Sequence, residues 1–281
     1  MLLALNVNNT NTVIALYPMQ DGVPGELRIT WRISTRHAQT ADEYGILIRN
    51  LLQGEGVAGS EITGIIIASV VPPVDWILRT FCERYFQQKP VFIEPGVKTG
   101  LPILTDHPGE VGADRVANCV GAFERYGGPC IVVDFGTATN FDVVSQKGEF
   151  LGGAIAPGLM ISAEALFARA ARLPRVEIKR PSKVIGTNTV DNLQIGLFYG
   201  HIGLVDSILE KMIAELGPET TCVATGGLAH LIAGESRYIK QVNDTLTLEG
   251  LRIIYARSLA AKQGAKGRKS AEGSHSSQNR A

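Results

Sequence analysis

Two stretches decide the fold, "LALNVNNTNTVIAL" (residues 3–16) and "IVVDFGTATNFDVV" (residues 131–144). Each is an aliphatic run, a short segment of small polar residues and a second apolar run, which is typical of two strands joined by a turn. Aligned without a gap, the copies match Asn6 with Asp134, Asn8 with Gly136 and Thr10 with Ala138. The repeat therefore predicts two related domains that each begin with a hairpin.

The segments around the hairpins alternate between strand-like and helix-like patterns. We expect further strands near 27–33, 62–73, 90–95 and 148–159, and helices near 41–53, 74–86, 159–172, 189–216 and 247–261. A loop running into a helix is expected at 108–128, and a strand, Gly-Gly turn and helix at 220–233. Thr40 is placed to cap the first helix. The predicted class is α/β, with domains at 1–127 and 128–261 and a disordered tail at 262–281, which has no apolar residue larger than alanine.

Composition excludes several classes of protein. Lys plus Arg and Asp plus Glu both number 27 among 281 residues, so no net positive field favours nucleic acid or an anionic membrane. No apolar run approaches the ~20 residues that span a bilayer. The four cysteines are far apart in apolar stretches, which predicts buried free thiols and a reducing cytoplasm rather than a zinc site or disulfides.

The polar turns suggest a phosphate site. A turn of Gly, Asn and Thr can aim backbone N–H groups and hydroxyls into one anion-binding concavity, and Asn and Gly tolerate the positive φ angles expected there. A single copy is more simply an ordinary hairpin turn. Two copies, expected to face each other across a cleft, favour a polyphosphate ligand. Neither a P-loop nor a dinucleotide fingerprint is present.

Three further clusters contain candidate functional residues. Asp134, at the end of its strand, is a candidate cation ligand or an aspartate that bonds its own turn. In "EVGADR" (110–115), Arg115 is placed to hold a carboxylate and Asp114 to accept a hydroxyl proton, although an aspartate in a first helical turn also serves as a partner of the helix dipole. Gly226 and Gly227 in "ATGGLA" permit close approach by a flat ring or a phosphate, or simple helix–strand packing.

Several motifs in order resemble the type III pantothenate kinase family over residues 2 to about 261. They are "NVNNTNT" (6–12), where the family usually has D-V-G-N-T-N, "ASVVP" (68–72), "TGLPI" (99–103), "PGEVGADR" (108–115), "VDFGTATNFD" (133–142), "GGAIAPGL" (152–159), "GTNT" (186–189) and "ATGGLA" (224–229). The resemblance implies two duplicated ribonuclease-H-like, actin-like ATPase domains with mixed sheets flanked by helices. It also implies ATP-dependent phosphorylation of the primary hydroxyl of pantothenate, the first step to coenzyme A.

The same resemblance assigns roles to single residues. Asp114 is the expected proton acceptor, and Gly112, Ala113, Asp114 and Arg115 line the expected pantothenate site with Thr189 opposite. Thr137 is expected to contact ATP together with Asn6, Val7, Asn8, Asn9, Thr10, Asn11, Thr12 and Val13. Asp134 is expected to bind a monovalent cation, potassium or ammonium, beside Mg-ATP. The family forms homodimers, so a homodimer is expected.

The departures from the family pattern leave three readings open. Asn6 replaces an aspartate and cannot offer an anion to Mg²⁺, Asn8 replaces a glycine, and Thr105 stands where relatives often have an aromatic residue. The first reading is an active kinase with slow turnover or an altered metal demand. The second is a catalytically impaired homologue that binds pantothenate or nucleotide as an accessory or regulatory protein. The third is a kinase of the same superfamily for another small hydroxylated substrate.

Overall fold

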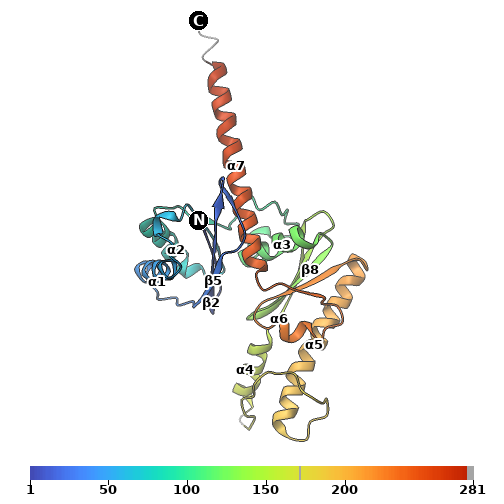
Figure 1. The fold of residues 1–281 in the computed structure, drawn as a ribbon. Coiled ribbons are helices and arrows are strands. Elements are labelled where there is room, and N and C mark those ends of the chain that lie inside the picture. Colours follow the sequence, from blue (N-terminus) through green and yellow to red (C-terminus); the bar gives the residue numbers. More distant parts are fainter. Residues whose placement is uncertain (171, 277–281) are drawn as a thin grey trace. The chain divides into compact units, whose positions relative to one another are not determined.

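The computed structural model describes residues 1–170 and 172–276 and contains two five-stranded sheets of the same design (Figure 1). The first sheet has the order β5 (Ile29–Ser34), β2 (Asn11–Tyr17), β1 (Leu2–Val7), β6 (Gly64–Ser69) and β7 (Val91–Phe92). The second has the order β10 (Phe150–Pro157), β9 (Ala138–Val144), β8 (Cys130–Phe135), β11 (Thr221–Thr225) and β12 (Gln241–Val242). In both sheets three antiparallel strands are followed by two parallel ones. The predicted duplication of a mixed α/β sheet is confirmed.

The contacts within the chain divide it into two compact units. Unit 1 comprises Met1–Gly100, Gly109–Gly121 and Thr247–Ala281, and unit 2 comprises Leu101–Pro108 and Ala122–Leu246. This division differs from a single boundary near Gly127-Gly128. One reason is that Gly250, in the last helix, packs so closely on the backbone of Ala117 that a Cβ on it would lie 1.8 Å from the Ala117 oxygen. The C-terminal helix therefore belongs with unit 1.

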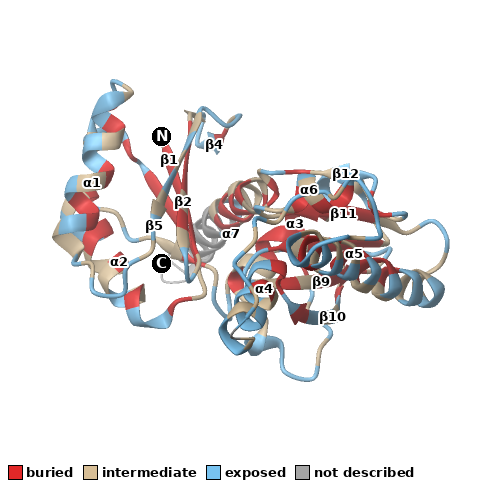
Figure 2. Ribbon diagram, turned by 90° about the horizontal axis from the view of Figure 1, so that it is seen from below, coloured by how far each residue is buried: buried red, intermediate tan, exposed pale blue. Residues whose placement is uncertain are grey.

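In unit 1, α1 (Ala41–Gly54) and α2 (Pro72–Phe86) pack together and form a core with one face of the sheet. Alternate residues Leu3, Leu5 and Val7 of β1 contribute to this core, as the two-residue period of a strand requires. Thr40 caps α1 as predicted: its hydroxyl accepts from the Glu43 N–H, and the Glu43 carboxylate accepts from the Thr40 N–H. Figure 2 shows buried residues concentrated along the strands of each unit.

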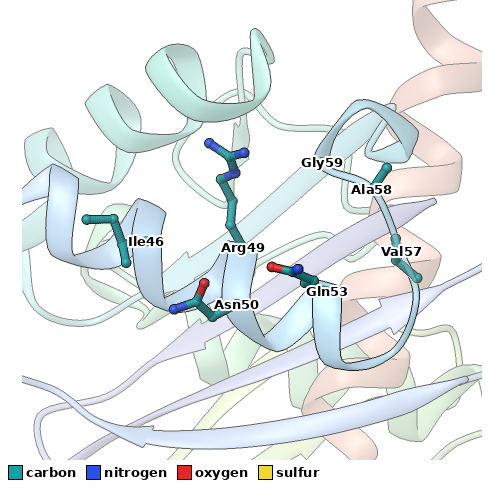
Figure 3. Close-up of a pocket in the computed structure, with 7 residues that line it drawn as sticks. All are labelled: Ile46, Arg49, Asn50, Gln53, Val57, Ala58 and Gly59. Atoms are coloured by element: carbon teal, nitrogen blue, oxygen red, sulfur yellow. The ribbon is translucent and has the colours of Figure 1, made fainter.

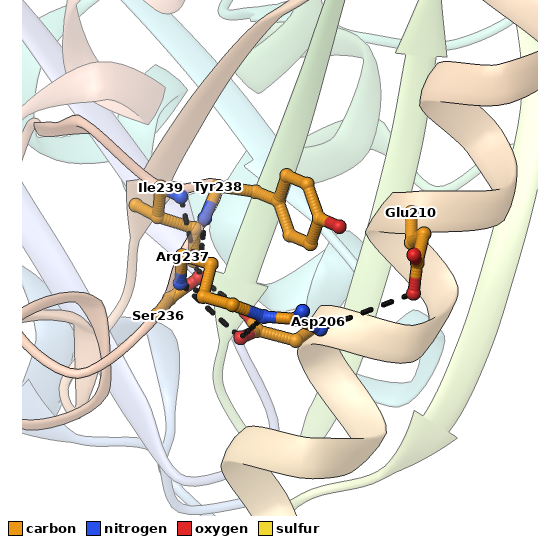
Figure 4. Close-up of polar contacts among 6 residues, drawn as sticks. All are labelled: Asp206, Glu210, Ser236, Arg237, Tyr238 and Ile239. Carbon is orange, nitrogen blue, oxygen red and sulfur yellow. Dashed lines mark hydrogen bonds and ion pairs between the residues drawn. The ribbon is translucent and has the colours of Figure 1, made fainter.

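Unit 2 repeats the arrangement with different helices. Its core joins β8, β9 and β11 to α5 (Thr189–Leu216) and α6 (Ala229–Ala233), while α4 (Leu159–Arg169) follows β10. Asp206 of α5 is 5% exposed and accepts hydrogen bonds from the Ser236 hydroxyl and from the Arg237 side chain and N–H (Figure 4). This network fixes the segment after α6 onto α5.

The two hairpins differ by one residue in their turns. Val7 pairs with Thr12 across residues 8–11, whereas Phe135 pairs with Thr139 across residues 136–138. The ungapped alignment is therefore wrong after the turn, because Asn11, not Thr10, is equivalent to Ala138. In the corrected alignment Thr12 matches Thr139, and β2 and β9 have the same pattern of buried and partly buried residues.

The remaining elements connect and extend the two sheets. They are the short hairpin of β3 (Met19–Gln20) and β4 (Val23–Pro24), the 3₁₀ turns at Gly59–Glu61 and Pro108–Glu110, and α3 (Ala113–Tyr126). The short hairpin, the first of the 3₁₀ turns and β12 lie where the sequence predicts no element.

The last helix, α7 (Leu246–Ser276), is longer than expected. It continues beyond residue 261, where we predicted a disordered tail, since Ala, Lys, Arg and Gln in this segment have high helix propensity. Residues 277–281 of the predicted tail lie outside the described residues. No helix within the described part of the chain is long and apolar enough to cross a membrane. The cysteines Cys82, Cys119, Cys130 and Cys222 are buried and free, as predicted.

Candidate active site

The first polar turn, residues 8–11, forms with negative φ angles throughout. The Asn8 N–H donates to the Asn11 carbonyl over 3.1 Å, and the Thr35 N–H donates to the Thr10 carbonyl over 3.0 Å. No residue of this turn has a positive φ, and neither does Gly136 in the second turn. The expectation that the turns need positive φ is therefore wrong, since these hydrogen bonds close the first turn without it.

The residues expected to contact ATP from 6–13 are not equally accessible. Asn9 and Thr10 are exposed at the tip, and Asn8, Asn11 and Val13 are half-buried. Val7 and Thr12 are fully buried, and the Thr12 hydroxyl lies 2.9 Å from the Thr35 hydroxyl. Val7 and Thr12 can therefore offer a ligand only their backbone groups.

Asn6 has an unusual environment for an amide. It is 7% exposed, and its Oδ1 has no hydrogen-bond partner among the described residues. Its neighbours Leu5 and Val7 belong to the core cluster, so the alternation of β1 directs Asn6 to the opposite face of the sheet. A buried amide oxygen without a partner costs free energy, and a ligand, water or metal-bound water would satisfy it.

Val70, in the "ASVVP" motif, connects the first hairpin with the acid-containing motif of unit 1. Its N–H donates to the Val7 carbonyl over 3.0 Å, and its Cγ1 would lie 3.5 Å from a Cβ on Gly112. The same Cβ would lie 2.8 Å from Asp114 Oδ1. The glycine thus leaves room for the carboxylate, and the structure brings the strand end before the first turn and the Gly112–Arg115 segment together.

Asp114 occupies the first turn of α3, directly after the buried Ala113. Its Oδ1 accepts from the Arg115 N–H over 2.8 Å, and both Asp114 and Arg115 are half-buried. Burial raises the pKa of Asp114 above its ordinary value, although the Arg115 N–H and positive charge oppose the shift. A carboxylate with a raised pKa is a stronger proton acceptor than a free aspartate once it is ionised.

The second turn, in unit 2, is anchored at its tip. The Gly136 N–H donates to the Ala138 carbonyl, and the Gly158 N–H donates to the Thr137 carbonyl over 3.2 Å. A Cβ on Gly158 would lie 2.2 Å from that Thr137 oxygen, so only glycine permits this approach at the start of α4. Thr137 itself is exposed, as contact with a ligand requires.

Asp134 lies beside the Gly-Gly turn that joins β11 to α6. Gly226 has a φ of +92°, and a Cβ on it would lie 2.5 Å from Asp134 Oδ1 and 2.7 Å from the Phe135 backbone nitrogen. Gly227 is exposed and has no neighbour within 4 Å of such a Cβ. The structure thus brings Asp134 and Gly226 together and leaves Gly227 open to a ligand.

Thr189, the expected residue opposite the substrate, is the exposed first residue of α5. The preceding Asn188 caps the helix by accepting from the Asp191 N–H over 2.9 Å. The structure therefore groups the predicted residues by unit: the first turn with Asp114 in unit 1, and the second turn, Asp134, the glycine pair and Thr189 in unit 2.

The described residues contain no group of three or more His, Cys, Asp or Glu side chains that could hold a metal ion. A surface pocket of about 420 Å³ is lined by α1 and the segment after it, and none of its lining residues is a predicted site residue (Figure 3).

Sequence reasoning assigned no role to three residues near the two turns, Thr139, Gly158 and Val70. The buried hydroxyls of Thr12 and Thr139 become equivalent only when the alignment contains a gap. Gly158 and Val70 were quoted within motifs but received no role. The Pro157-Gly158 pair was the available signal that the backbone at residue 158 approaches another segment closely. Nothing in the sequence marked Val70.

Comparison with known proteins supplies the family. A family model described as type III pantothenate kinase matches residues 2–211. A type III pantothenate kinase of Acidobacterium capsulatum is 72% identical over 272 residues, covering 96% of this chain and 100% of the relative. One from Koribacter versatilis is 60% identical over 263 residues, covering 92% of this chain and 96% of the relative.

A solved structure supports the fold. The chain resembles a putative 2-dehydro-3-deoxygalactonokinase from Sinorhizobium meliloti with a TM-score of 0.57 and 15% identity. The match covers 93% of this chain and 96% of that one. At this identity the likeness concerns the architecture alone.

Proposed function

Because the chain belongs to the type III pantothenate kinase family, we propose that it transfers the γ-phosphoryl group of ATP to the primary hydroxyl of pantothenate. In this reaction the turn at 8–11 and the turn at 136–138 both contact the phosphates of ATP. Their exposed tips, Asn9, Thr10 and Thr137, are available to a ligand. Gly226 and Gly227 leave space for a further part of the nucleotide.

The single observation that carries the chemistry is the placement of Asp114. It stands at the start of α3 with a pKa raised by burial, next to the guanidinium of Arg115. As general base it accepts the proton of the pantothenate hydroxyl while that oxygen attacks the γ-phosphorus, and the bond from the γ-phosphorus to the β,γ-bridging oxygen breaks to release ADP. Catalysis of phosphoryl transfer depends mostly on positioning the reactants and on stabilising charge, so the protein needs to supply only one oriented general base.

The substrate is held by the residues around the base. Arg115 pairs with the pantothenate carboxylate, Gly112 and Ala113 line the approach to Asp114, and Thr189 contributes a hydroxyl. Gly112 supports this role because its lack of a Cβ keeps space beside the Asp114 carboxylate.

Two cations complete the proposal. Mg²⁺, bound to ATP, neutralises the charge that develops on the phosphates, and Asp134 binds a monovalent cation, potassium or ammonium. The partnerless Oδ1 of Asn6 can accept a hydrogen bond from a metal-bound water, while a phosphate oxygen would accept from the amide NH2 group instead. Asn6 cannot supply the charge of an aspartate, so the demand for Mg²⁺ is expected to be altered.

The alternative, a binding protein without catalysis, rests on Asn6 alone. The family match and identities of up to 72% over nearly the whole chain favour the kinase. Full-length protein incubated with pantothenate, Mg-ATP and KCl should yield 4'-phosphopantothenate, detected by mass spectrometry, and Asp114→Asn should yield far less. Binding of ATP or pantothenate with no product from the wild type would overturn the kinase function.

Two properties of the whole protein are part of the proposal. We expect a homodimer, because nine of the thirteen large hydrophobic residues found exposed in the described part of the chain belong to unit 2: Leu104, Leu151, Ile155, Met160, Ile161, Leu166, Val184, Ile185 and Val190. We expect the reaction to take place in the cytoplasm, which is supported by four free, buried cysteines.

A further inference from the structure

A buried histidine contacts the root of the second turn. His201 of α5 is 6% exposed, and its Nε2 lies 3.2 Å from the hydroxyl of Thr139, which is 1% exposed. Its ring centroid is 6.1 Å from that of Phe135. Phe135 and Thr139 form the hairpin pair that encloses residues 136–138. One imidazole therefore contacts both strands where the turn begins and ends.

The contact is a polar one within an apolar core. Phe198 and Ile202, beside the histidine in α5, belong to the core cluster of unit 2. Burial lowers the pKa of His201, which keeps the imidazole neutral. A neutral ring and a hydroxyl satisfy each other in this core, and removal of either would leave the other as a buried polar group without that partner.

The equivalent position in unit 1 also has a polar anchor, of different chemistry. Thr12 matches Thr139 in the corrected repeat, and its hydroxyl lies 2.9 Å from that of Thr35. Valine has nearly the shape of threonine but lacks the hydroxyl, so at either position it would remove this polar contact. Both units have a threonine there and a polar partner for it. This duplication indicates that the anchor serves the turn and not only the core.

We propose that His201 is a positioning residue for the nucleotide: through Thr139 and Phe135 it fixes the turn at 136–138 in the conformation that receives the ATP phosphates. The inference rests on the assignment of this turn to ATP under the proposed function. A turn that is fixed before binding needs no ordering when ATP arrives, so loosening it weakens ATP binding. Helix α5 also begins at Thr189, so one helix contains both a proposed substrate contact and the nucleotide anchor.

The test compares His201→Leu with His201→Gln in the full-length protein. Leucine fills space without a polar atom, whereas the glutamine amide can reach the Thr139 hydroxyl. We expect His201→Leu to raise KM for ATP by about three- to tenfold, the effect of one buried hydrogen bond, with KM for pantothenate nearly unchanged. His201→Gln should restore most of the ATP affinity. Equal increases in both KM values, or no rescue by glutamine, would overturn the proposal.

A matched control separates positioning from loss of stability. Ile202→Ala removes a core side chain of α5 adjacent in sequence, but it leaves the imidazole and the Thr139 hydroxyl in place. At a comparable decrease in Tm it should leave KM for ATP unchanged. If Ile202→Ala raises that KM as much as His201→Leu does, His201 has only a structural role.

Thr139 provides an independent route if the histidine variants fail to fold. Thr139→Val should raise KM for ATP as His201→Leu does, Thr139→Ser should not, and the double variant should be no worse than either single one, because both remove the same interaction. Additive effects would contradict the coupling. Calorimetric Kd values for ADP, measured in parallel, keep this test separate from the kinase assignment, since they test the anchor even if wild-type protein makes no phosphopantothenate.

Discussion

Asp114 is the residue on which the proposed chemistry most depends. Replacing the carboxylate in Asp114→Asn removes the proton acceptor but keeps the shape, so kcat should fall by about a hundredfold or more while the Kd for ATP changes little. Burial raises the folded-state pKa of this group, which means that its ionised form is disfavoured by folding at neutral pH. The variant should therefore keep or increase Tm. Near-normal kcat would remove Asp114 as the base.

The pH dependence of the rate follows from the same pKa. Asp114 must be ionised to accept a proton, and because its pKa is raised, kcat/KM should begin to fall at a higher pH than an ordinary aspartate would allow. Arg115 lowers that pKa by its charge, so Arg115→Met should move the acid limb of the profile to still higher pH. An acid limb that does not move in this variant would show that another group controls it.

Asn6 tests the metal chemistry at a single atom. Asn6→Asp places a carboxylate where a partnerless amide oxygen now lies, so the Mg²⁺ concentration for half-maximal rate should fall by about tenfold, equivalent to roughly 1.4 kcal/mol of added charge interaction. Asn9→Asp adds the same charge at the exposed tip of the same turn and should not reproduce the effect. An unchanged Mg²⁺ requirement in Asn6→Asp would mean that this side chain does not organise the metal.

At the scale of elements, the turn between β11 and α6 makes the sharpest prediction. Gly226→Ala would force a Cβ to within 2.5 Å of Asp134 Oδ1 at a φ of +92°. The strained backbone alone costs about 1–2 kcal/mol, so Tm should fall by roughly 2–8 °C, and KM for ATP should rise as Asp134 is displaced. Gly227→Ala, which meets nothing within 4 Å, should leave Tm unchanged. Equal Tm values for the two variants would contradict the packing described here.

The elements also show how far sequence reasoning reaches. The strands and helices follow from hydrophobic periodicity, and Thr40 with Glu43 marks the start of α1, because both are local signals. The length of the second turn is different. It is set by a hydrogen bond from the Gly136 N–H to the Ala138 carbonyl. The small polar residues of the turn and its flanks are compatible with more than one turn length, so the sequence does not reveal it. The threonine anchors stayed hidden for that reason.

At the scale of the molecule, the division into units was the least predictable feature. The repeat in the sequence suggests a cut between the copies, but α7 returns to the first sheet, where Tyr255 meets Gly64 and Arg257 donates to the Thr99 carbonyl over 2.7 Å. Contacts between segments so distant in sequence depend on tertiary packing, and hydrophobic periodicity indicates only local secondary structure. The proposed site residues lie in short motifs at strand and helix ends, so the sequence alone could single them out, and their roles stay predictions.

The proposed homodimer gives the last prediction. Ile155, in β10 at the edge of its sheet, is 65% exposed, and Ile185 is 83% exposed. Large apolar side chains exposed in this number favour an interface. Ile155→Glu and Ile185→Glu should convert a dimer into a monomer in light scattering at micromolar concentration, since a charge at an apolar interface is not solvated. Ile46→Glu, which adds the same charge at a 56% exposed isoleucine of unit 1, should remain dimeric. A monomeric wild type, or dimers in all three variants, would contradict a dimer interface that contains Ile155 and Ile185.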